Sequence, residues 1–207
     1  MSVTFVTATG TDVGKTFLTA GMIRYFRDGR IPVDALKPVA TGFDDDAPEW
    51  TDTAVLLGAL GRRTTPEEIE RVSPFRFAAP LSPDMAARRE RRKLDFGELL
   101  EFSRRAVQNH EGQMLIEGVG GIMVPLDEQH TVLDWMMAIN RPVVLVAGSY
   151  LGSISHTLTC LDVLAKRSLE VKAVVVNETP ASTVPMMETM ETMRRFVSNV
   201  PVFARSE

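Results

Sequence analysis

Hydrophobic and polar positions follow a repeating order along the chain. A short apolar run leads into a polar or glycine-containing turn, and a segment with apolar residues near every 3.6 positions comes next. This order is typical of βαβ units, in which helices cover both faces of a parallel sheet. Several runs are apolar at successive positions, as strands buried on both sides are. The pattern predicts an α/β fold with a mostly parallel sheet and helices on both faces.

The positions of the strands and helices follow from the same pattern. Strands are expected at Val3–Thr7, Val33–Lys37, Gln113–Glu117, Val143–Ala147 and Lys172–Val176, with a last one at Val202–Phe203. Helices are expected at Lys15–Asp28, Phe96–Asn109, Thr131–Ile139, Ser153–Arg167 and Pro185–Phe196. The irregular acidic stretch Thr41–Glu49 is expected to be an exposed loop.

Length and composition indicate one globular domain over residues 1–207. The net charge of −4 provides no general attraction to nucleic acid or to anionic membranes, and the basic run at 88–93 is expected to be a solvated face. Cys160 is the sole cysteine and is expected to be a small core residue. No run of 18 apolar residues and no signal-peptide pattern is present, so we expect a soluble, cytoplasmic protein without a membrane partner.

The segment Thr9–Thr16, here called the phosphate loop, reads Thr-Gly-Thr-Asp-Val-Gly-Lys-Thr and joins the first strand to the first helix. In this context backbone N–H groups and the helix dipole hold phosphate oxygens, the lysine reaches the β- and γ-phosphates, and the threonine hydroxyl binds Mg²⁺. The usual first glycine of this motif is replaced by Thr9, with Gly10 one position later. The alternative is a strand-to-helix turn with a solvated Lys15.

Charged residues stand where two other strands end. Ligands of doubly wound sheets bind outside the carboxyl ends of the strands, so Lys37 and Glu117 are candidates for neutralising an anion and for holding Mg²⁺. The alternative for Lys37 is a solvated lysine at a strand end, and the alternative for Glu117 is an exposed turn residue. Asp52, which begins a helical stretch, taken alone looks more like an N-cap. The combination of Lys15, Lys37 and Glu117 at three strand ends favours a functional site.

With these residues the chain resembles the dethiobiotin synthetases, the ATP-dependent carboxylases of biotin biosynthesis. The resemblance runs from Val3 to about Phe203. The matching pieces are the phosphate loop, Lys-Pro-Val-Ala-Thr-Gly (37–42), Ser-Pro-Phe-Arg-Phe with Ala-Pro-Leu-Ser-Pro (73–83), Glu-Gly-Val-Gly-Gly with Val-Pro-Leu (117–126), Leu-Gly-Ser-Ile-Ser-His (151–156) and Val-Asn-Glu-Thr (176–179).

The resemblance implies a reaction and a set of site residues. CO2 would form a carbamate on 7,8-diaminopelargonic acid, ATP would phosphorylate it, and the second amine would close the ring. Lys37, Lys15 and Thr11 would be catalytic, and Thr16, Asp52 and Glu117 would bind Mg²⁺. The nucleotide would contact Asp12, Val13, Gly14, Lys15, Thr16, Phe17, Glu117, Gly120, Asn177 and Pro201. The substrate would contact Asp12, Lys37, Thr41, Ser82, Gly118, Gly152 and Ser153, its carboxylate meeting free N–H groups at the last two.

Some features depart from the family or leave alternatives open. Ala8 stands where the family commonly has glycine, and the chain has no late tyrosine, since Tyr25 and Tyr150 are its tyrosines. A related P-loop synthetase with another substrate is one alternative, and a partitioning or metallochaperone-type nucleotide switch is another. Such switches usually have an additional lysine early in the loop, which residues 8–11 lack. The resemblance also implies a homodimer, whose interface could include the methionines at 186, 187, 190 and 193.

Overall fold

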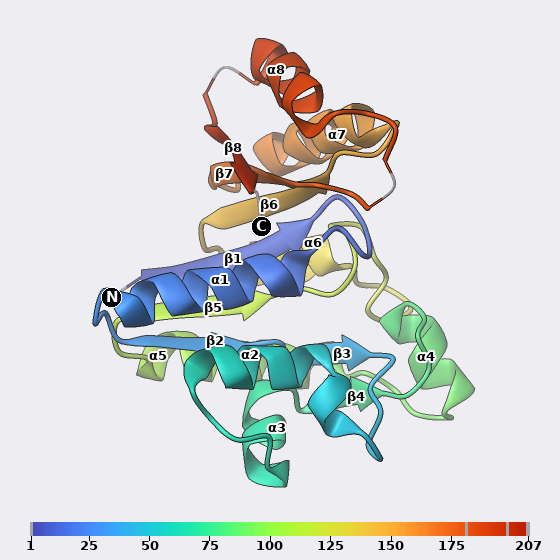
Figure 1. Ribbon diagram of the computed structural model, residues 1–207. Helices are drawn as coiled ribbons and strands as arrows, with labels where there is room; N and C mark the ends of the chain where they lie inside the picture. Colours follow the sequence, from blue (N-terminus) through green and yellow to red (C-terminus); the bar gives the residue numbers. More distant parts are fainter. Residues whose placement is uncertain (1, 181, 198, 206–207) are drawn as a thin grey trace.

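The computed structural model describes residues 2–180, 182–197 and 199–205 and has a central parallel sheet (Figure 1). Within these ranges six strands pair in the order β2-β5-β1-β6-β7-β8, and every neighbouring pair is parallel. The strands are β1 (Ser2–Ala8), β2 (Val33–Leu36), β5 (Gln113–Glu117), β6 (Val143–Gly148), β7 (Val171–Asn177) and β8 (Val202–Arg205). The predicted α/β fold with a parallel sheet is confirmed.

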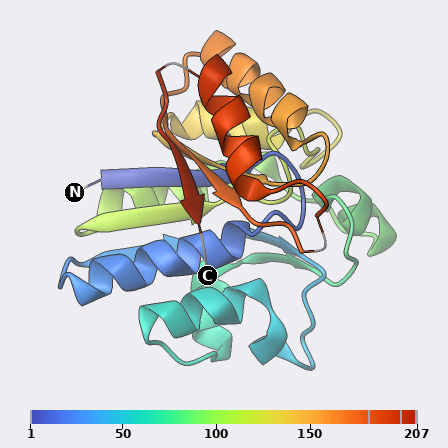
Figure 2. The same ribbon diagram turned by 45° about the horizontal axis from the view of Figure 1, so that its top comes forward.

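Helices cover both faces of this sheet (Figure 1 and Figure 2). They are α1 (Lys15–Asp28), α2 (Asp52–Leu60), α3 (Pro66–Val72), α4 (Pro83–Arg89), α5 (Phe96–Asn109), α6 (Val132–Ile139), α7 (Ser153–Lys166) and α8 (Met186–Phe196), with a short 3₁₀ helix η1 (Pro48–Trp50). Apolar residues of α1, α2 and α3 pack on one face, and those of α5, α6, α7 and α8 pack on the other.

Alternate residues of each strand supply the two halves of the core. In β1, Phe5 belongs to the cluster under α5 and α6, whereas Val6 belongs to the cluster under α1. Phe5 meets Trp135 of α6 edge to face, with 4.8 Å between the ring centroids. The indole N–H of Trp135 donates to the Ser103 hydroxyl of α5, which satisfies a polar group buried in the core.

The region between β2 and β5 contains elements that the apolar pattern missed. β3 (Val39–Thr41) and β4 (Phe75–Phe77) form a separate parallel pair. The stretch Thr41–Glu49, predicted as an exposed loop, is one only in part. Its first residue ends β3 and Phe43 is buried, with its N–H donating to the Phe77 carbonyl. These elements bring Thr41 and the turn before α4 over the carboxyl edge of the main sheet.

The predicted element boundaries differ from the structure by one or two residues at several ends. Lys37 follows β2 and does not belong to it. Thr131 and Pro185 are N-caps, and Arg167 is a C-cap, so none of the three is inside its helix. Thr131 forms a capping box with Asp134, which explains the start of α6 at the following residue.

The methionines of α8 do not form a surface stripe. Met190 and Met193 are fully buried in the core of this chain, and Met186 packs against that core. Met187 is the exposed member of the set. The suggestion that these methionines cover a subunit interface is therefore wrong for the two buried ones, because their side chains are already covered within the protomer.

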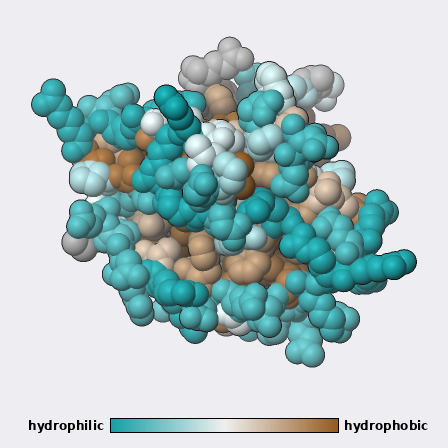
Figure 3. All heavy atoms as spheres, turned by 90° about the horizontal axis from the view of Figure 1, so that it is seen from below, coloured by the Kyte–Doolittle hydropathy of each residue, from teal (hydrophilic) through white to brown (hydrophobic). Residues whose placement is uncertain are grey.

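Neither the described helices nor the face seen in Figure 3 has a membrane-spanning character. No helix within the described ranges has both the length and the apolar character needed to cross a membrane. Seen from below, hydrophilic side chains surround the hydrophobic areas (Figure 3). The basic run at 88–93 is mostly exposed, and Arg88 pairs with Asp84 while Arg92 pairs with Glu90. The prediction of a solvated face for this run is confirmed.

Cys160 is buried in α7, as predicted, and its burial raises the pKa of the thiol to about 11. At pH 8 roughly one thiol in a thousand is then ionised, and the thiolate is the reactive form. We expect a disulfide reagent such as DTNB to label the native protein at least about 100-fold more slowly than a small free thiol. Unfolding in guanidinium should release one equivalent of fast-reacting thiol, whereas prompt labelling of the native protein would contradict the buried placement.

Gly112, which precedes β5, has a left-handed backbone with φ of 74°. An alanine Cβ there would overlap the Pro32 carbonyl oxygen, which accepts a hydrogen bond from the Gln113 N–H. We expect Gly112→Ala to lower the free energy of unfolding by about 2–4 kcal/mol. The matched control is Gly58→Ala on the exposed side of α2, where no atom lies within 4 Å, and a gain of up to about 1 kcal/mol is expected. Urea unfolding measures both, and equal effects would refute the backbone argument.

Candidate active site

Three neighbouring strands of the sheet end at the candidate site. β2, β5 and β1 are adjacent in the sheet, and at their carboxyl ends stand Lys37, Glu117 and the phosphate loop. Because all three strands are parallel, these ends lie at one edge of the sheet. The sequence expectation that these residues share an edge is met by the topology.

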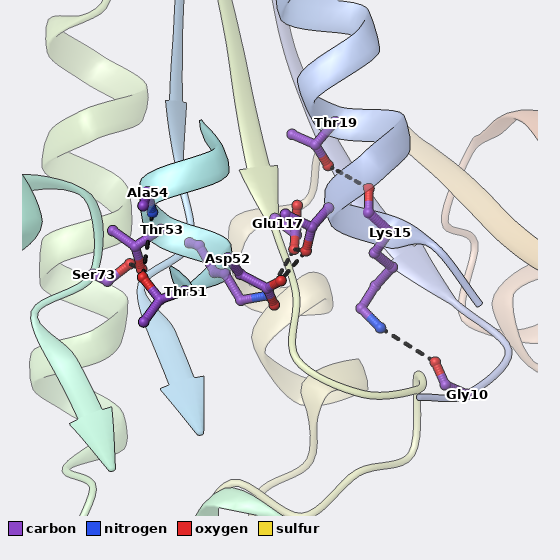
Figure 4. Close-up of polar contacts among 11 residues, drawn as sticks. Gly10, Lys15, Thr19, Thr51, Asp52, Thr53, Ala54, Ser73 and Glu117 are labelled. Atoms are coloured by element: carbon purple, nitrogen blue, oxygen red, sulfur yellow. Dashed lines mark hydrogen bonds and ion pairs between the residues drawn. The ribbon is translucent and has the colours of Figure 1, made fainter. Parts of the chain in front are cut away.

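The phosphate loop leads into α1 with its N–H groups uncapped. Gly14 is the N-cap residue, in a left-handed conformation with φ of 86°, and it makes no side-chain cap hydrogen bond. The Lys15 ammonium donates to the Gly10 carbonyl at 3.2 Å, so the lysine folds back over the loop (Figure 4). An uncapped helix start beside a lysine can hold an anion such as a phosphate.

A cluster of charged and hydroxyl groups lies next to this loop. The Lys37 ammonium donates to Glu117 Oε1 at 2.8 Å and to the Thr16 hydroxyl at 3.3 Å, and it forms an ion pair with Asp52. Thr16 donates to the same Glu117 oxygen at 2.6 Å. The carboxyl groups of Asp52 and Glu117 therefore point toward one another across the ammonium (Figure 4).

Burial and charge shift the pKa values of this cluster. Burial, with the charge of Lys37 as the second cause, lowers the pKa of Lys15 to about 8. Burial also acts to lower the pKa of Lys37, but the Glu117 and Asp52 carboxylates outweigh it and the pKa is raised. Burial acts to raise the pKa of Asp52, yet the charge of Lys37 and its hydrogen bond bring that pKa below its ordinary value. The raised pKa of Lys37 and the lowered pKa of Asp52 favour the charged forms of both partners in this ion pair.

The position of Asp52 depends on the start of α2. Thr51 is the N-cap, since its hydroxyl accepts from the Ala54 N–H, and Asp52 is the first helical residue. The interpretation of Asp52 as an N-cap is therefore wrong by one position. The Thr53 and Ser73 hydroxyls are hydrogen-bonded at 2.8 Å and both are fully buried (Figure 4). This contact ties α2 to the end of α3 and holds Asp52 over the cavity.

A cavity of about 670 Å³ opens above the cluster. Many of the predicted site residues line it: Thr11, Asp12, Gly14, Lys15, Thr16, Phe17, Lys37, Thr41, Asp52, Ser82 and Gly120. Both lysines are buried, since Lys15 is 8% and Lys37 is 5% exposed. Their ammonium groups reach the cavity from buried stems, which excludes the alternative of solvated lysines.

Other predicted residues lie behind or beside the cavity. Glu117 is fully buried beneath it, which excludes the exposed-turn alternative, and a Cβ added at Gly118 would come within 3.0 Å of the Phe5 ring. Asn177 donates to the carbonyls of Val13 at 2.8 Å and Gly14 at 3.2 Å, and so supports the phosphate loop from β7.

Three more predicted residues lie on other elements. Gly152 and Ser153 form the start of α7, and the Pro201 carbonyl accepts from Val174 just before β8. None of the three lines the cavity in the described part of the chain. A contact at any of these positions therefore requires a part of the substrate or nucleotide that extends beyond the cavity.

Sequence reasoning missed the apolar wall of the cavity. It is formed by Pro80, Leu81, Pro83, Val119 and Val124. The short motifs that contain these residues were visible in the sequence, but no helical or strand period marked them. Their positions depend on the β3–β4 pair and on α4, which begins at Pro83.

The oxygens of the cluster suit a hard divalent cation. Thr16, Asp52 and Glu117 offer hydroxyl and carboxylate oxygens, the ligands that Mg²⁺ prefers. Glu117 Oε2 is buried and has no hydrogen-bond partner among the described residues, so it is free to accept a further donor or cation. No group of three or more His, Cys, Asp or Glu side chains in the described ranges could hold a metal. A metal here would need further ligands from solvent or phosphate.

Known proteins match this chain over nearly its whole length. A family model described as an AAA domain matches residues 2–205. An ATP-dependent dethiobiotin synthetase of Acidiphilium cryptum is 46% identical over 97% of this chain and 91% of that protein. One of Methylobacterium nodulans is 44% identical over 94% and 89%, and one of Legionella pneumophila is 34% identical over 98% and 92%. The chain belongs to the ATP-dependent dethiobiotin synthetase family. The suspected family, the enzyme class and ATP dependence are thereby confirmed.

More distant proteins share the fold alone. The cell division ATPase MinD of Pyrococcus furiosus superimposes with a TM-score of 0.53 at 17% identity, over 98% of this chain and 81% of that one. The signal recognition particle receptor FtsY of Elizabethkingia anophelis gives a TM-score of 0.56 at 15% identity, over 100% and 59%. At these identities the likeness shows a common P-loop α/β architecture and carries no conclusion about activity.

Proposed function

We propose that this chain, as one ATP-binding domain, carboxylates 7,8-diaminopelargonic acid with CO2 and closes the ureido ring of dethiobiotin, releasing ADP and phosphate. The observation that carries the proposal is the convergence of Lys15, Lys37 and the Glu117–Asp52 carboxylates at one edge of a cavity large enough for a small substrate. Family membership supplies the reaction, and the cavity supplies a place for it.

The bond changes define what the protein must do. One amine of the diamine adds to CO2 and loses a proton, giving a carbamate. A carbamate oxygen then attacks the γ-phosphoryl group, and ADP leaves. The second amine attacks the carbonyl carbon of this mixed anhydride, loses its proton and expels phosphate. Negative charge gathers between carbamate and phosphate, so catalysis here is positioning and charge stabilisation and needs no covalent enzyme intermediate.

The two lysines would stabilise this negative charge. Lys15, beside the uncapped start of α1, would bind the β- and γ-phosphates, and Lys37, which lines the same cavity, would contact the carbamate and the transferring group. Bound Mg²⁺, held by Thr16, Asp52 and Glu117, would neutralise phosphate charge. Thr11 and Asp12 line the same cavity and would lie beside the transferring group and the diamine.

The remaining predicted residues would contact the parts of the diamine and of ATP that lie away from the reacting groups. Thr41 and Ser82 on the cavity wall would contact the diamine chain. Its carboxylate would reach the start of α7, where Gly152 has no side-chain cap and the buried Ser153 hydroxyl has no hydrogen-bond partner among the described residues. The Asn177 Oδ1 has no hydrogen-bond partner among the described residues and would meet the adenine beside the phosphate loop. Pro201 lies before β8 next to Val174, whereas Asn177 ends β7, so a nucleotide contact at Pro201 would be separate from the one at Asn177. A homodimer and a cytoplasmic location stay predictions.

Phosphate release from Mg·ATP tests the proposal. We expect release to depend on both the diamine and bicarbonate, and mass spectrometry of the product should show the cyclic urea. Omitting the diamine is the internal control for unproductive hydrolysis. Slow release that is indifferent to the diamine would reject the proposal and favour a different substrate of the same fold.

A further inference from the structure

The Lys37 ammonium lies at the point where the proposed metal ligands converge. Its contacts are the ion pair with Asp52, Glu117 Oε1 at 2.8 Å and Thr16 Oγ1 at 3.3 Å. These are the oxygens assigned above to Mg²⁺. One cation of the protein therefore occupies the position that another cation would need.

The two cations compete for the same oxygens. Mg²⁺ binds oxygen at roughly 2.0–2.1 Å and requires near-octahedral geometry. If the three oxygens surrounded Mg²⁺ while still bonded to the ammonium, two like charges would lie close together in a mostly buried site. Metal entry at these oxygens thus requires the ammonium to leave.

A buried carboxylate explains why an ammonium group stands there. Glu117 is fully buried, and an unpaired carboxylate in such a place is strongly disfavoured. Lys37 supplies the missing charge, although Glu117 Oε2 still has no hydrogen-bond partner among the described residues. The ammonium satisfies the site incompletely, and a metal with more coordination positions would satisfy it better.

The side chain of Lys37 is able to move while its backbone stays in place. The Lys37 N–H donates to the Val72 carbonyl at 3.0 Å, which fixes the main chain beyond β2. The four-carbon stem of lysine is flexible and ends in a point charge. The ammonium borders the cavity, so leaving the carboxylates brings it into the space for the transferring group.

We propose that Lys37 is a placeholder cation, which holds the metal position in the nucleotide-free protein and is displaced into the cavity when the metal enters with the nucleotide. This inference rests on the metal site of the proposed function. Displacement of Lys37 would make the charge that stabilises the carbamate available only when Mg·ATP has bound. Lys15 does not share this position, because its ammonium bonds to the Gly10 carbonyl.

Binding of Mn²⁺ to the nucleotide-free protein, measured by electron paramagnetic resonance, tests the displacement. Lys37→Met keeps most of the side-chain volume and removes the charge, and we expect it to bind Mn²⁺ at least about tenfold more tightly than the wild type. Lys172→Met is the control, since it removes an exposed lysine of β7 outside the cavity, and a change of less than about threefold is expected. Adding Asp52→Asn to Lys37→Met should abolish the gain.

Equal or weaker Mn²⁺ binding by Lys37→Met would overturn the inference. Binding of Mn²⁺ by the wild type with ADP separates this outcome from failure of the metal site itself. If ADP-dependent binding is present and is lost in Asp52→Asn, the ligand set stands and the placeholder alone fails. If the wild type with ADP binds no Mn²⁺, the metal part of the proposed function fails and the inference fails with it.

A measurement on the wild type keeps the test independent of how well Lys37→Met folds. The ammonium groups of ¹⁵N-lysine-labelled protein are observed by NMR, and Lys37 is assigned with Lys37→Arg. We expect its signal to shift on addition of Mg·ADP and to stay in place with ADP and EDTA. A Lys37 signal that is unchanged by Mg·ADP would overturn displacement, whatever the variants show.

Discussion

Replacing Lys37 with alanine is expected to lower the turnover number for the diamine by at least about 10³-fold. In the proposed mechanism the Lys37 ammonium is the charge that stabilises the carbamate and the transferring group, and water admitted in its place would carry no fixed charge. Removal of one preorganised charge or donor in a water-excluded site typically costs about 10²–10³ in rate, and Lys37 also neutralises Glu117. Steady-state assays that follow the cyclic urea by mass spectrometry measure the effect.

Stability controls are needed because Lys37 is buried. Removing one member of a buried ion pair costs about 3–5 kcal/mol, so Lys37→Ala is expected to lower the free energy of unfolding as well as the turnover number. Circular dichroism and urea unfolding should show a folded but less stable protein at 10 °C. Lys172→Ala, an exposed lysine of β7, is the matched control and should keep wild-type turnover. A folded Lys37→Ala variant with turnover within tenfold of the wild type would contradict the assignment.

The main sheet and its long helices were predictable because each buries one periodic apolar face. The bounds of α1, α5 and β5 agree with the apolar pattern at both ends. The short pair β3 and β4 was not predictable, since each strand has three residues and a period of two cannot be read over so short a run. Helix α2 is apolar from Ala54 to Leu60 except at Gly58, so its apolar positions show no clear helical period. Its start is determined by the Thr51 cap.

The sequence could predict which strand ends form the candidate site, but it could not predict the hydrogen bonds and ion pairs between the side chains there. Parallel topology alone places Lys37, Glu117 and the phosphate loop at one edge. The ion pair with Asp52 depends on where α2 docks, and that depends on the hydroxyl contact between Thr53 and Ser73, which no local pattern reports. The burial of both lysines was missed for the same reason, because the segments that cover them come from other parts of the chain.

A second large effect is expected at Gly14, the N-cap of α1. Its φ of 86° is unfavourable by about 1–2 kcal/mol for an alanine, and an added Cβ would overlap the Asn177 amide that hydrogen-bonds to the Val13 and Gly14 carbonyls. Relief of that overlap moves either the phosphate loop or Asn177, and both are parts of the proposed nucleotide site. We expect Gly14→Ala to weaken ADP binding by at least about 100-fold, as measured by isothermal titration calorimetry.

Gly10 in the same loop provides the control that separates backbone strain from a general intolerance of side chains. A Cβ on Gly10 meets no atom within 4 Å, and its φ is not in the left-handed region. Its carbonyl, which accepts from Lys15, is retained in an alanine variant. We therefore expect Gly10→Ala to bind ADP within about threefold of the wild type. Equal losses in the two variants would mean that the loop closes on its nucleotide too tightly for any added atom, and the role assigned to the Gly14 backbone and Asn177 would be wrong.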